Sequence, residues 1–229
     1  MAKSVPVVED IMSANRKKAL ENRSRFNEGG IFALNLMASP GAGKTSVISE
    51  TIKNLKDEYK IAYIDGDVAT SIDADKIAAL NIPAVQINTG GQCHLDAVMI
   101  ENALTKLVLN EIDILLVENV GNLICPTGFQ LGAHQNVLIA SVPEGDDKPY
   151  KYPGMYQGVD CMLLNKMDVI DAFDFRMDYF KQGVEILNPG LSFFPVSCKT
   201  GEGFQAWLAW IQKEVKTFRK SKGEDYEIR

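Results

Sequence analysis

The sequence has 229 residues, of which 46% are hydrophobic and 24% are charged, as in a folded globular chain with one sizeable core. A formal net charge of −6 argues against a nucleic-acid surface, which needs a basic stripe. No apolar run approaches the roughly 20 residues of a membrane span, and the start of the sequence lacks the pattern of a secretory signal, so we expect a cytoplasmic protein.

Helical and strand-like patterns alternate along the chain. A charged helical pattern over residues 8–28 ends at Gly29 and Gly30, which predicts a helical element, residues 1–30, packed on a single domain of residues 31–229. We expect buried strands at residues 32–37, 61–64, 84–88, 114–119, 136–142, 161–166 and 191–197. We expect helices at residues 44–57, 71–80, 93–110, 169–186 and 202–219.

This alternation predicts an α/β fold with a doubly wound, mainly parallel sheet and helices on both faces. Such sheets bind their ligands at the carboxyl ends of the strands. The last helix carries one apolar face, which we expect to be buried, formed by Phe204, Trp207, Leu208 and Ile211.

The first predicted strand runs directly into the stretch ASPGAGKTS, residues 38–46. A Walker A loop needs glycines whose amides surround a β-phosphate, a lysine for the β and γ oxygens, and a hydroxyl for Mg²⁺. Ala38 replaces the leading glycine of the strict pattern, but the order of strand, loop and helix still favours a phosphate site over a glycine-rich turn. The predicted fold is therefore that of the P-loop NTPases. The residues that we assign to the phosphate site are Gly41, Ala42, Gly43, Lys44, Thr45 and Ser46.

Two later strand ends predict that the nucleotide is GTP. The stretch NKMD places Asp168 where a carboxylate can accept hydrogen bonds from N1–H and the exocyclic amine of guanine, which adenine does not offer. A site built on that contact can reject the wrong base by roughly 10⁴-fold. In the same loop Asn165 would brace the backbone and Lys166 would lie along the base. The stretch VSCKTG, residues 196–201, resembles a second guanine-contacting loop, formed by Ser197, Cys198 and Lys199.

Acidic residues near two further strand ends are candidates for catalysis and for Mg²⁺ binding. Glu118 closes the run ILLVE in the place of a Walker B residue. The stretch IDGDVATSIDADKI, residues 64–77, contains several aspartates, for which helix capping is the alternative role. We assign catalysis by positioning and charge neutralisation to Lys44, Asp67, Asp73 and Glu118. We assign Mg²⁺ binding to Thr45, Asp67 and Glu118.

The stretch GGQCHLDA places Cys93 beside His94, and Cys125 follows in ENVGNLICP. Thiolate and imidazole bind Zn²⁺ or Ni²⁺, and the two segments could meet if their strands are neighbours in the sheet. Three ligands leave one position of a tetrahedron open, for transfer of the metal or for a second copy of the chain. The alternative is a structural role for buried thiols. That is our interpretation of the other two cysteines, Cys161 and Cys198, and His134 has no visible partner in the sequence.

Taken together, the stretches SPGAGKTS, DGDVATSIDADKI, TGGQCHLDA, ENVGNLICP, EGDDKPYKYPGMY and NKMD closely resemble the HypB family, the nickel-insertion GTPases of NiFe-hydrogenase maturation. The resemblance covers roughly residues 31–201. It implies a SIMIBI-class G protein that forms a GTP-dependent homodimer and carries Ni²⁺ or Zn²⁺ at Cys93, His94 and Cys125. It also implies a zinc-containing partner of the HypA type and a hydrogenase large subunit as the target.

The sequence departs from the HypB pattern at its N-terminal side, and the resemblance also implies a nucleotide-dependent metal site. Many HypB proteins begin with a cysteine-rich motif or a histidine-rich tract, whereas neither precedes Cys93 here, so the resemblance does not extend to nickel storage at the N-terminus. We expect GTP-bound and GDP-bound chains to position Glu118 and Cys125 differently, so that metal affinity depends on the nucleotide. We expect residues 146–156 to form a loop near the nucleotide and the dimer face, or a rigid surface loop.

Three other functions stay open from the sequence. The related GTPases of urease maturation use a Cys-Pro-His metal motif, whereas Pro126 follows Cys125 here without a histidine. A P-loop kinase for a small molecule is disfavoured by Asp168 and by the second base loop. A noncatalytic metal-binding adaptor would not hydrolyse GTP.

Overall fold

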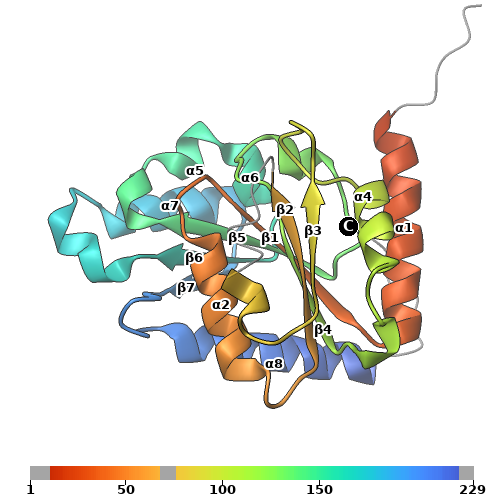
Figure 1. Ribbon diagram of the computed structural model, residues 1–229. Coiled ribbons are helices and arrows are strands. Elements are labelled where there is room, and N and C mark those ends of the chain that lie inside the picture. The colour runs from red at the N-terminus through yellow and green to blue at the C-terminus, as the bar shows by residue number, and fades with distance from the viewer. Residues whose placement is uncertain (1–10, 68–75, 222–229) are drawn as a thin grey trace, which may run out of the picture.

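The computed structural model describes residues 11–67 and 76–221 (Figure 1). The strands are β1 (Phe32–Ala38), β2 (Ile61–Asp67), β3 (Ala84–Asn88), β4 (Ile114–Glu118), β5 (Gln135–Ser141), β6 (Cys161–Asn165) and β7 (Ser192–Pro195). The helices are α1 (Ile11–Gly29), α2 (Lys44–Leu55), α4 (Ala97–Leu104), α5 (Lys148–Lys151), α6 (Pro153–Gln157), α7 (Met177–Leu187) and α8 (Phe204–Lys220). Short 3₁₀ helices span Leu109–Glu111, Cys125–Gly128, Val142–Glu144 and Met167–Ala172.

The strands form one parallel sheet in the order β3-β2-β4-β1-β5-β6-β7, which confirms the predicted fold class. Every predicted strand overlaps an observed one. Strands β2, β3 and β4 lie on one side of β1, and the chain then crosses to the other side for β5, β6 and β7. The carboxyl end of β1 is therefore a switch point, where doubly wound sheets bind ligands, and the predicted phosphate loop follows it directly.

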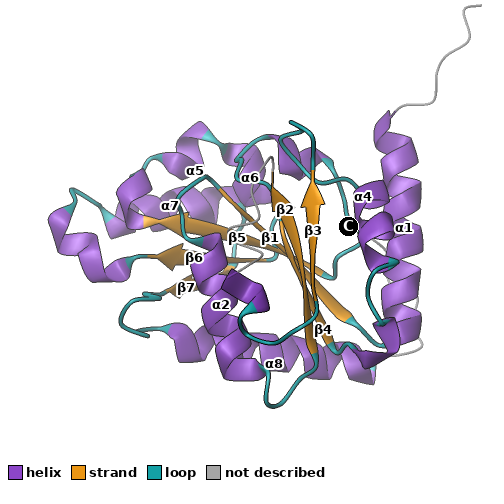
Figure 2. Ribbon diagram, viewed as in Figure 1, coloured by secondary structure: helices purple, strands orange, loops and turns teal. Residues whose placement is uncertain are grey.

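Helices cover both faces of the sheet (Figure 2). On one face α2 and α8 pack over β1, where Leu34 and Leu36 share a core with Ile48 and Trp207. The predicted apolar face of the last helix is buried there, and Trp207 Nε1 donates to Thr51 Oγ1 at 2.9 Å. On the opposite face α1 and α4 cover β2 and β4, whereas α6 and α7 cover β5 and β6.

His134, for which the sequence showed no partner, has two partners in the core. Its Nδ1 accepts the backbone N–H of Ala33 at 3.0 Å, so the neutral ring carries its proton on Nε2, which lies 3.0 Å from Asn27 Oδ1. The ring also lies against Phe32 and Phe218. Although the residue as a whole reaches the surface, burial of the ring lowers the pKa of His134 to about 2. The imidazole is a neutral structural link between α1, β1 and α8.

Two helix predictions are wrong at their ends. The predicted helix 93–110 is shorter in the structure, where α4 ends at Leu104. It begins at Ala97 because Asp96 caps it by accepting the Met99 N–H at 2.7 Å. Residues 93–96 therefore belong to a loop, so the backbone of Cys93 and His94 is not helical. The predicted helix 169–186 begins late, because a 3₁₀ helix occupies residues 167–172 and α7 starts at Met177.

Residues 146–156, expected as a loop, instead contain α5 and α6. Each begins with a proline in its first turn, Pro149 and Pro153, where the missing N–H and the fixed φ are compatible with a helix. Of the predicted helix 71–80, residues 71–75 lie outside the described residues, and so does Asp73. Within residues 11–67 and 76–221, no helix is both long and apolar enough to cross a membrane.

Candidate nucleotide and metal sites

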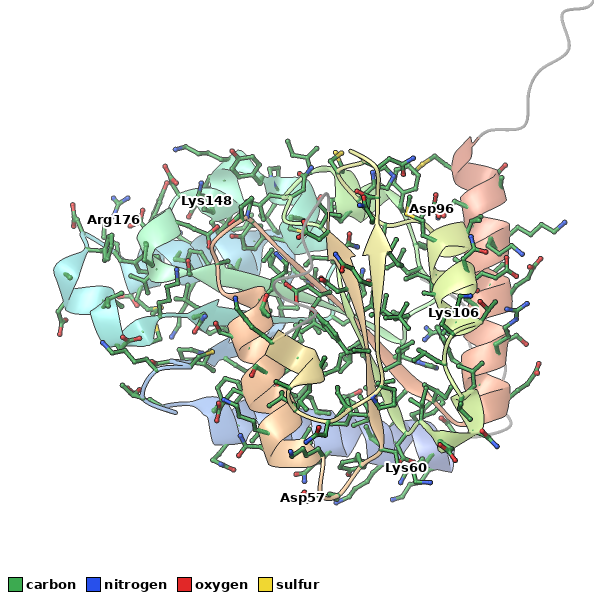
Figure 3. All side chains as sticks on the ribbon, viewed as in Figure 1. Asp57, Lys60, Asp96, Lys106, Lys148 and Arg176 are labelled. Atoms are coloured by element: carbon green, nitrogen blue, oxygen red, sulfur yellow. The ribbon has the colours of Figure 1, made fainter. Side chains whose placement is uncertain are left out.

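The loops that carry the predicted site residues follow the carboxyl ends of the strands (Figure 3). The figure shows Asp96, which precedes α4, near the carboxyl end of β3. Asp57 and Lys60 lie at the opposite edge, where α2 ends and β2 begins. A parallel sheet brings all such loops to one edge, so residues far apart in the sequence can form a common site.

The phosphate loop depends on Gly43 for two reasons. Its φ of 96° lies in the left-handed region, and a Cβ there would lie 2.5 Å from Asn165 Nδ2. That close approach allows Asn165 Nδ2 to donate to the Ala42 carbonyl at 3.1 Å. Lys44, at the start of α2, is only 8% exposed. The N-terminus of α2 and the loop amides can therefore surround an anion beside a buried lysine.

A cavity of about 600 Å³ lies between the phosphate loop and the two base loops. This brings together most of the residues assigned to the nucleotide from sequence. The cavity is lined by Gly43, Thr45, Ser46, Ser49, Glu50, Lys53, Lys76, Asn165, Lys166, Asp168, Val169, Cys198 and Lys199. Gly41 and the buried Ala42 belong to the adjoining turn.

The carboxylate of Asp168 is held in place by contacts within the protein. Ser197 Oγ donates to Asp168 Oδ1 at 2.7 Å, and Lys199 Nζ lies 3.9 Å from Asp168 Oδ2. The same Ser197 oxygen accepts the backbone N–H groups of Lys199 and Thr200, each at 3.2 Å. One loop thus orients the acceptor that the other loop supplies, which reduces the cost of ordering it when a ligand binds.

Lys166 and Asn165 join the base loops to the phosphate loop. Lys166 has a φ of 62°, and its Nζ donates to the Gly41 carbonyl at 2.7 Å. Asn165 Oδ1 accepts the Cys198 N–H at 3.4 Å. Burial raises the pKa of Cys198 to about 11, so its thiol stays protonated at neutral pH. That the Lys166 side chain lies along the base stays a prediction.

The Glu118 carboxylate accepts hydrogen bonds from two hydroxyl groups. The Thr45 hydroxyl donates to Glu118 Oε1 at 2.9 Å, and the Tyr63 hydroxyl donates to Glu118 Oε2 at 2.6 Å. Asp65 is in register with Glu118 across β2 and β4, so Asp67 ends β2 two residues further on. Hydroxyl and carboxylate oxygens suit Mg²⁺, so these residues fit the ion.

Two thiols and an imidazole meet at the other candidate site. Ligand atoms of Cys93, His94 and Cys125 all lie within 4.8 Å of one another, and Cys93 Sγ is 3.8 Å from His94 Nδ1. Cys93 is exposed and the other two are partly buried. The neighbouring Cys125 thiol raises the pKa of Cys93, and burial lowers the pKa of His94. The three donors are of the kinds that bind Ni²⁺ or Zn²⁺.

The expected route for this meeting, through neighbouring strands, is wrong, because β2 lies between β3 and β4. The ligands meet because the loops beyond the strands are joined. Asn122 Nδ2 donates to the Cys93 carbonyl at 3.4 Å, while Asn122 Oδ1 accepts the Ile124 N–H at 2.8 Å. His94 stacks on Phe129, with ring centroids 3.8 Å apart.

Helix α1 joins the same two segments a second time. Asn15 Oδ1 accepts the Ala97 N–H at 2.8 Å, and Asn15 Nδ2 donates to the Gln130 carbonyl at 2.9 Å. Asn22 Nδ2 donates to the carbonyls of Ala97 and Leu131, at 2.8 and 3.2 Å. Sequence reasoning missed these asparagines because nothing in a charged helical pattern marks them as inward-facing.

Two further polar residues were missed at the nucleotide site. Tyr63 lies inside an apolar strand pattern, so only the buried hydroxyl reveals its role in holding Glu118. Glu144 accepts the Ser39 hydroxyl of the phosphate loop and is itself held by the Ser141 N–H at 2.7 Å. Its position directly after a strand was an available signal, because the loops that follow parallel strands form the site.

The fold and the loops at its carboxyl edge define a P-loop nucleotide-binding protein with a cysteine and histidine cluster. Residues 32–195 match the family described as CobW/HypB/UreG, nucleotide-binding domain. The chain is 46% identical over 211 residues to the hydrogenase maturation factor HypB of Azotobacter vinelandii, which covers 92% of this chain and 70% of that protein. It is 42% identical over 218 residues to the hydrogenase/urease maturation factor HypB of Helicobacter pylori (strain ATCC 700392 / 26695), covering 93% of this chain and 89% of that protein.

A solved structure shows the same relationship. The crystal structure of HypB from Helicobacter pylori in complex with nickel matches with a TM-score of 0.85 and 36% identity, covering 94% of this chain and 100% of that one. The chain therefore belongs to the HypB family of P-loop nucleotide-binding proteins.

Proposed function

We propose that this protein is a GTP-hydrolysing metal carrier that couples the state of its nucleotide to delivery of Ni²⁺, or Zn²⁺, during maturation of a NiFe-hydrogenase. The observation that carries the proposal is the meeting of Cys93, His94 and Cys125 within 4.8 Å, at the sheet edge that also holds the phosphate and base loops. The hydrogenase maturation role of the A. vinelandii relative and the nickel bound to the H. pylori structure support it.

GTP hydrolysis would depend on positioning and charge neutralisation more than on covalent chemistry. The buried Lys44 and the amides around Gly43 bind the phosphates, and Asp168 with Ser197 binds guanine. Thr45, Asp67 and Glu118 would hold Mg²⁺, which neutralises phosphate charge when bound. Tyr63 keeps the Glu118 carboxylate oriented through its 2.6 Å hydrogen bond. Asp73, outside the described residues, remains a proposed catalytic residue.

The metal site is suited to transfer rather than to permanent storage. Within residues 11–67 and 76–221 the cluster offers three ligands, which leaves one position of a tetrahedron open, whereas a structural zinc site is closed by a fourth protein ligand. The open position can be taken by a second copy of the chain in a GTP-dependent homodimer, by a HypA-type accessory protein, or by the hydrogenase large subunit. Each of these partners belongs to the proposal.

Coupling follows from the chain connection between the two sites. Cys125 lies seven residues after Glu118, and the loop between them contacts the phosphate loop, because a Cβ on Gly121 would lie 3.2 Å from Pro40 Cγ. A change at the γ-phosphate that displaces this loop would displace Cys125. The nucleotide must bind the two arrangements unequally for metal affinity to change.

The test is a titration of Ni²⁺ and Zn²⁺ into protein loaded with GDP or with a nonhydrolysable GTP analogue. We expect different affinities in the two states, a substantial loss of affinity in Cys125→Ala, and unchanged nucleotide binding in that variant. Lys44→Ala should abolish GTP hydrolysis and leave the metal bound in the GDP state. Equal metal affinities in both nucleotide states would refute the coupling.

Urease maturation is a second candidate target, favoured by the hydrogenase/urease role of the H. pylori relative. Metal transfer from the loaded protein to purified apo-urease or to a hydrogenase large-subunit precursor would separate the two targets. A kinase function would instead appear as phosphate transferred from GTP to an acceptor other than water, which mass spectrometry of the products would detect.

A further inference from the structure

Leu95 follows His94, and its backbone is held from the nucleotide side. The Leu95 N–H donates to Asn119 Oδ1 at 3.1 Å, and both residues are fully buried. Asn119 follows Glu118 directly, and its own N–H donates to the Leu36 carbonyl of β1 at 2.9 Å. A residue at the end of the Glu118 strand therefore holds the backbone of the metal-bearing loop.

Asn119 is fixed in turn by a chain of amides that crosses the sheet. Asn119 Nδ2 donates to Asn35 Oδ1 at 3.1 Å, and Asn35 Nδ2 donates to Asn136 Oδ1 at 3.0 Å. Asn35 is 2% exposed. A buried polar network with its members paired maintains one geometry. Asn119 thus moves with the strand that leads into the phosphate loop.

The side chain of Leu95 contacts a second strand end. A Cβ added to Gly66 would lie 2.7 Å from Leu95 Cδ1 and Cγ, so only glycine allows this approach. Gly66 does not have a positive φ, which means that it is required for space and not for backbone conformation. Since Gly66 precedes Asp67, Leu95 contacts the neighbours of both acidic residues assigned to Mg²⁺.

We propose that Leu95 transmits the state of the nucleotide site to the metal site, with Asn119 and Gly66 as the positioning residues that act on it. The inference rests on the proposed function, in which Cys93 and His94 bind metal. Displacement of either strand end moves Leu95, and His94 moves with it because the two residues are adjacent. Packed interiors respond to such displacements by discrete rearrangement rather than by gradual deformation.

The test compares Leu95→Ala with Leu104→Ala, a substitution of another buried leucine in the same core. Ni²⁺ affinity is measured for the full chain loaded with GDP or with the GTP analogue. In the unmodified chain we expect the Ni²⁺ affinities of the two nucleotide states to differ at least fivefold. The affinity ratio should be about the same in Leu104→Ala. In Leu95→Ala the two affinities should agree within about twofold. Leu95→Met nearly conserves the side-chain volume, so this variant should keep the affinity ratio of the unmodified chain.

Each outcome decides a separate point. The role of Leu95 is overturned if Leu95→Ala keeps the affinity ratio of the unmodified chain, or if Leu104→Ala loses that ratio to the same extent. Either result leaves the proposed function intact. Equal affinities in the unmodified chain overturn the coupling itself, and this inference with it. If circular dichroism shows that Leu95→Ala is unfolded, Asn119→Ser removes the link to the backbone with less lost volume and carries the same expectations.

Discussion

The replacement Asp168→Asn should change the base that the protein binds from guanine to xanthine. A carboxylate accepts both N1–H and the exocyclic amine of guanine, whereas an amide presents one acceptor and one donor. Xanthine has N1–H and a carbonyl in place of the amine, so it matches the amide. The Ser197 hydroxyl, 2.7 Å from Asp168 Oδ1, can donate to the amide oxygen in the same way and keep it oriented.

The size of the effect follows from the two hydrogen bonds. A hydrogen bond to a charged group contributes about 1.5 to 3 kcal/mol, and a neutral one about 0.5 to 1.5 kcal/mol. Asparagine keeps one acceptor, so one bond is lost and the other becomes a neutral bond, which would weaken GDP binding by about 2.5 to 4.5 kcal/mol, or roughly 10² to 10³-fold. The Asp168 side chain is only 14% exposed, so water replaces these bonds poorly. The donor amine of guanine would also face the donor of the new amide.

The assay is competition of GDP and of xanthosine diphosphate against a fluorescent nucleotide, with the original chain and Asp171→Asn measured alongside. Asp171 lies on the same 3₁₀ helix and is exposed, so the same change there should leave both affinities unchanged. A loss of GDP affinity below about tenfold, or no gain for xanthosine diphosphate, would show that Asp168 does not contact the base.

Two other predictions concern stability and the metal site. His134 has a folded pKa of about 2, below its ordinary value, so the unfolded chain takes up the proton first as pH falls. This group should lower the free energy of unfolding by about 2 kcal/mol between pH 6.5 and 4.5. Urea unfolding of His134→Gln should show a correspondingly smaller decrease over the same pH range. An equal decrease in both proteins contradicts the assignment. Asn15→Ala removes hydrogen bonds to Ala97 and Gln130, so Ni²⁺ affinity should fall about tenfold with GDP affinity unchanged. The control Asn102→Ala, on exposed α4 surface, should match the original chain, and equal affinities for all three proteins would exclude a role for α1.

The fold was predictable because its signals are local. Strands buried on both faces give continuous apolar runs, such as FALNLM in β1, and the glycine-rich loop after that run is distinctive. Helix ends were less predictable, since the pattern looks helical from Cys93 onward, whereas α4 begins only after its cap at Asp96. The 3₁₀ helix after Lys166 depends on a positive φ at that residue, which a lysine in the sequence does not predict.

The structure brings together most of the residues that the sequence assigns to ligands, whereas the residues that hold them in place were not predictable. Thiols, imidazole and carboxylates have few common roles, so their spacing is informative. Asparagines have many roles, and Asn15, Asn22 and Asn119 reveal theirs only through partners that are distant in sequence. The strand order was also needed, because β2 lies between β3 and β4, so the two segments that carry the candidate metal ligands do not follow neighbouring strands.

That separation by β2 favours the coupling that we propose. If Cys93 and Cys125 followed neighbouring strands, one rigid body could carry both, and a movement at the nucleotide would leave their spacing unchanged. Here they belong to segments joined by the side chains of Asn122, Asn15 and Asn22. Metal–ligand distances tolerate only about 0.2 Å, so a small relative shift of the two segments is enough to alter affinity. A shift of that size requires no large rearrangement of the sheet, only a change at the strand ends that Leu95 contacts.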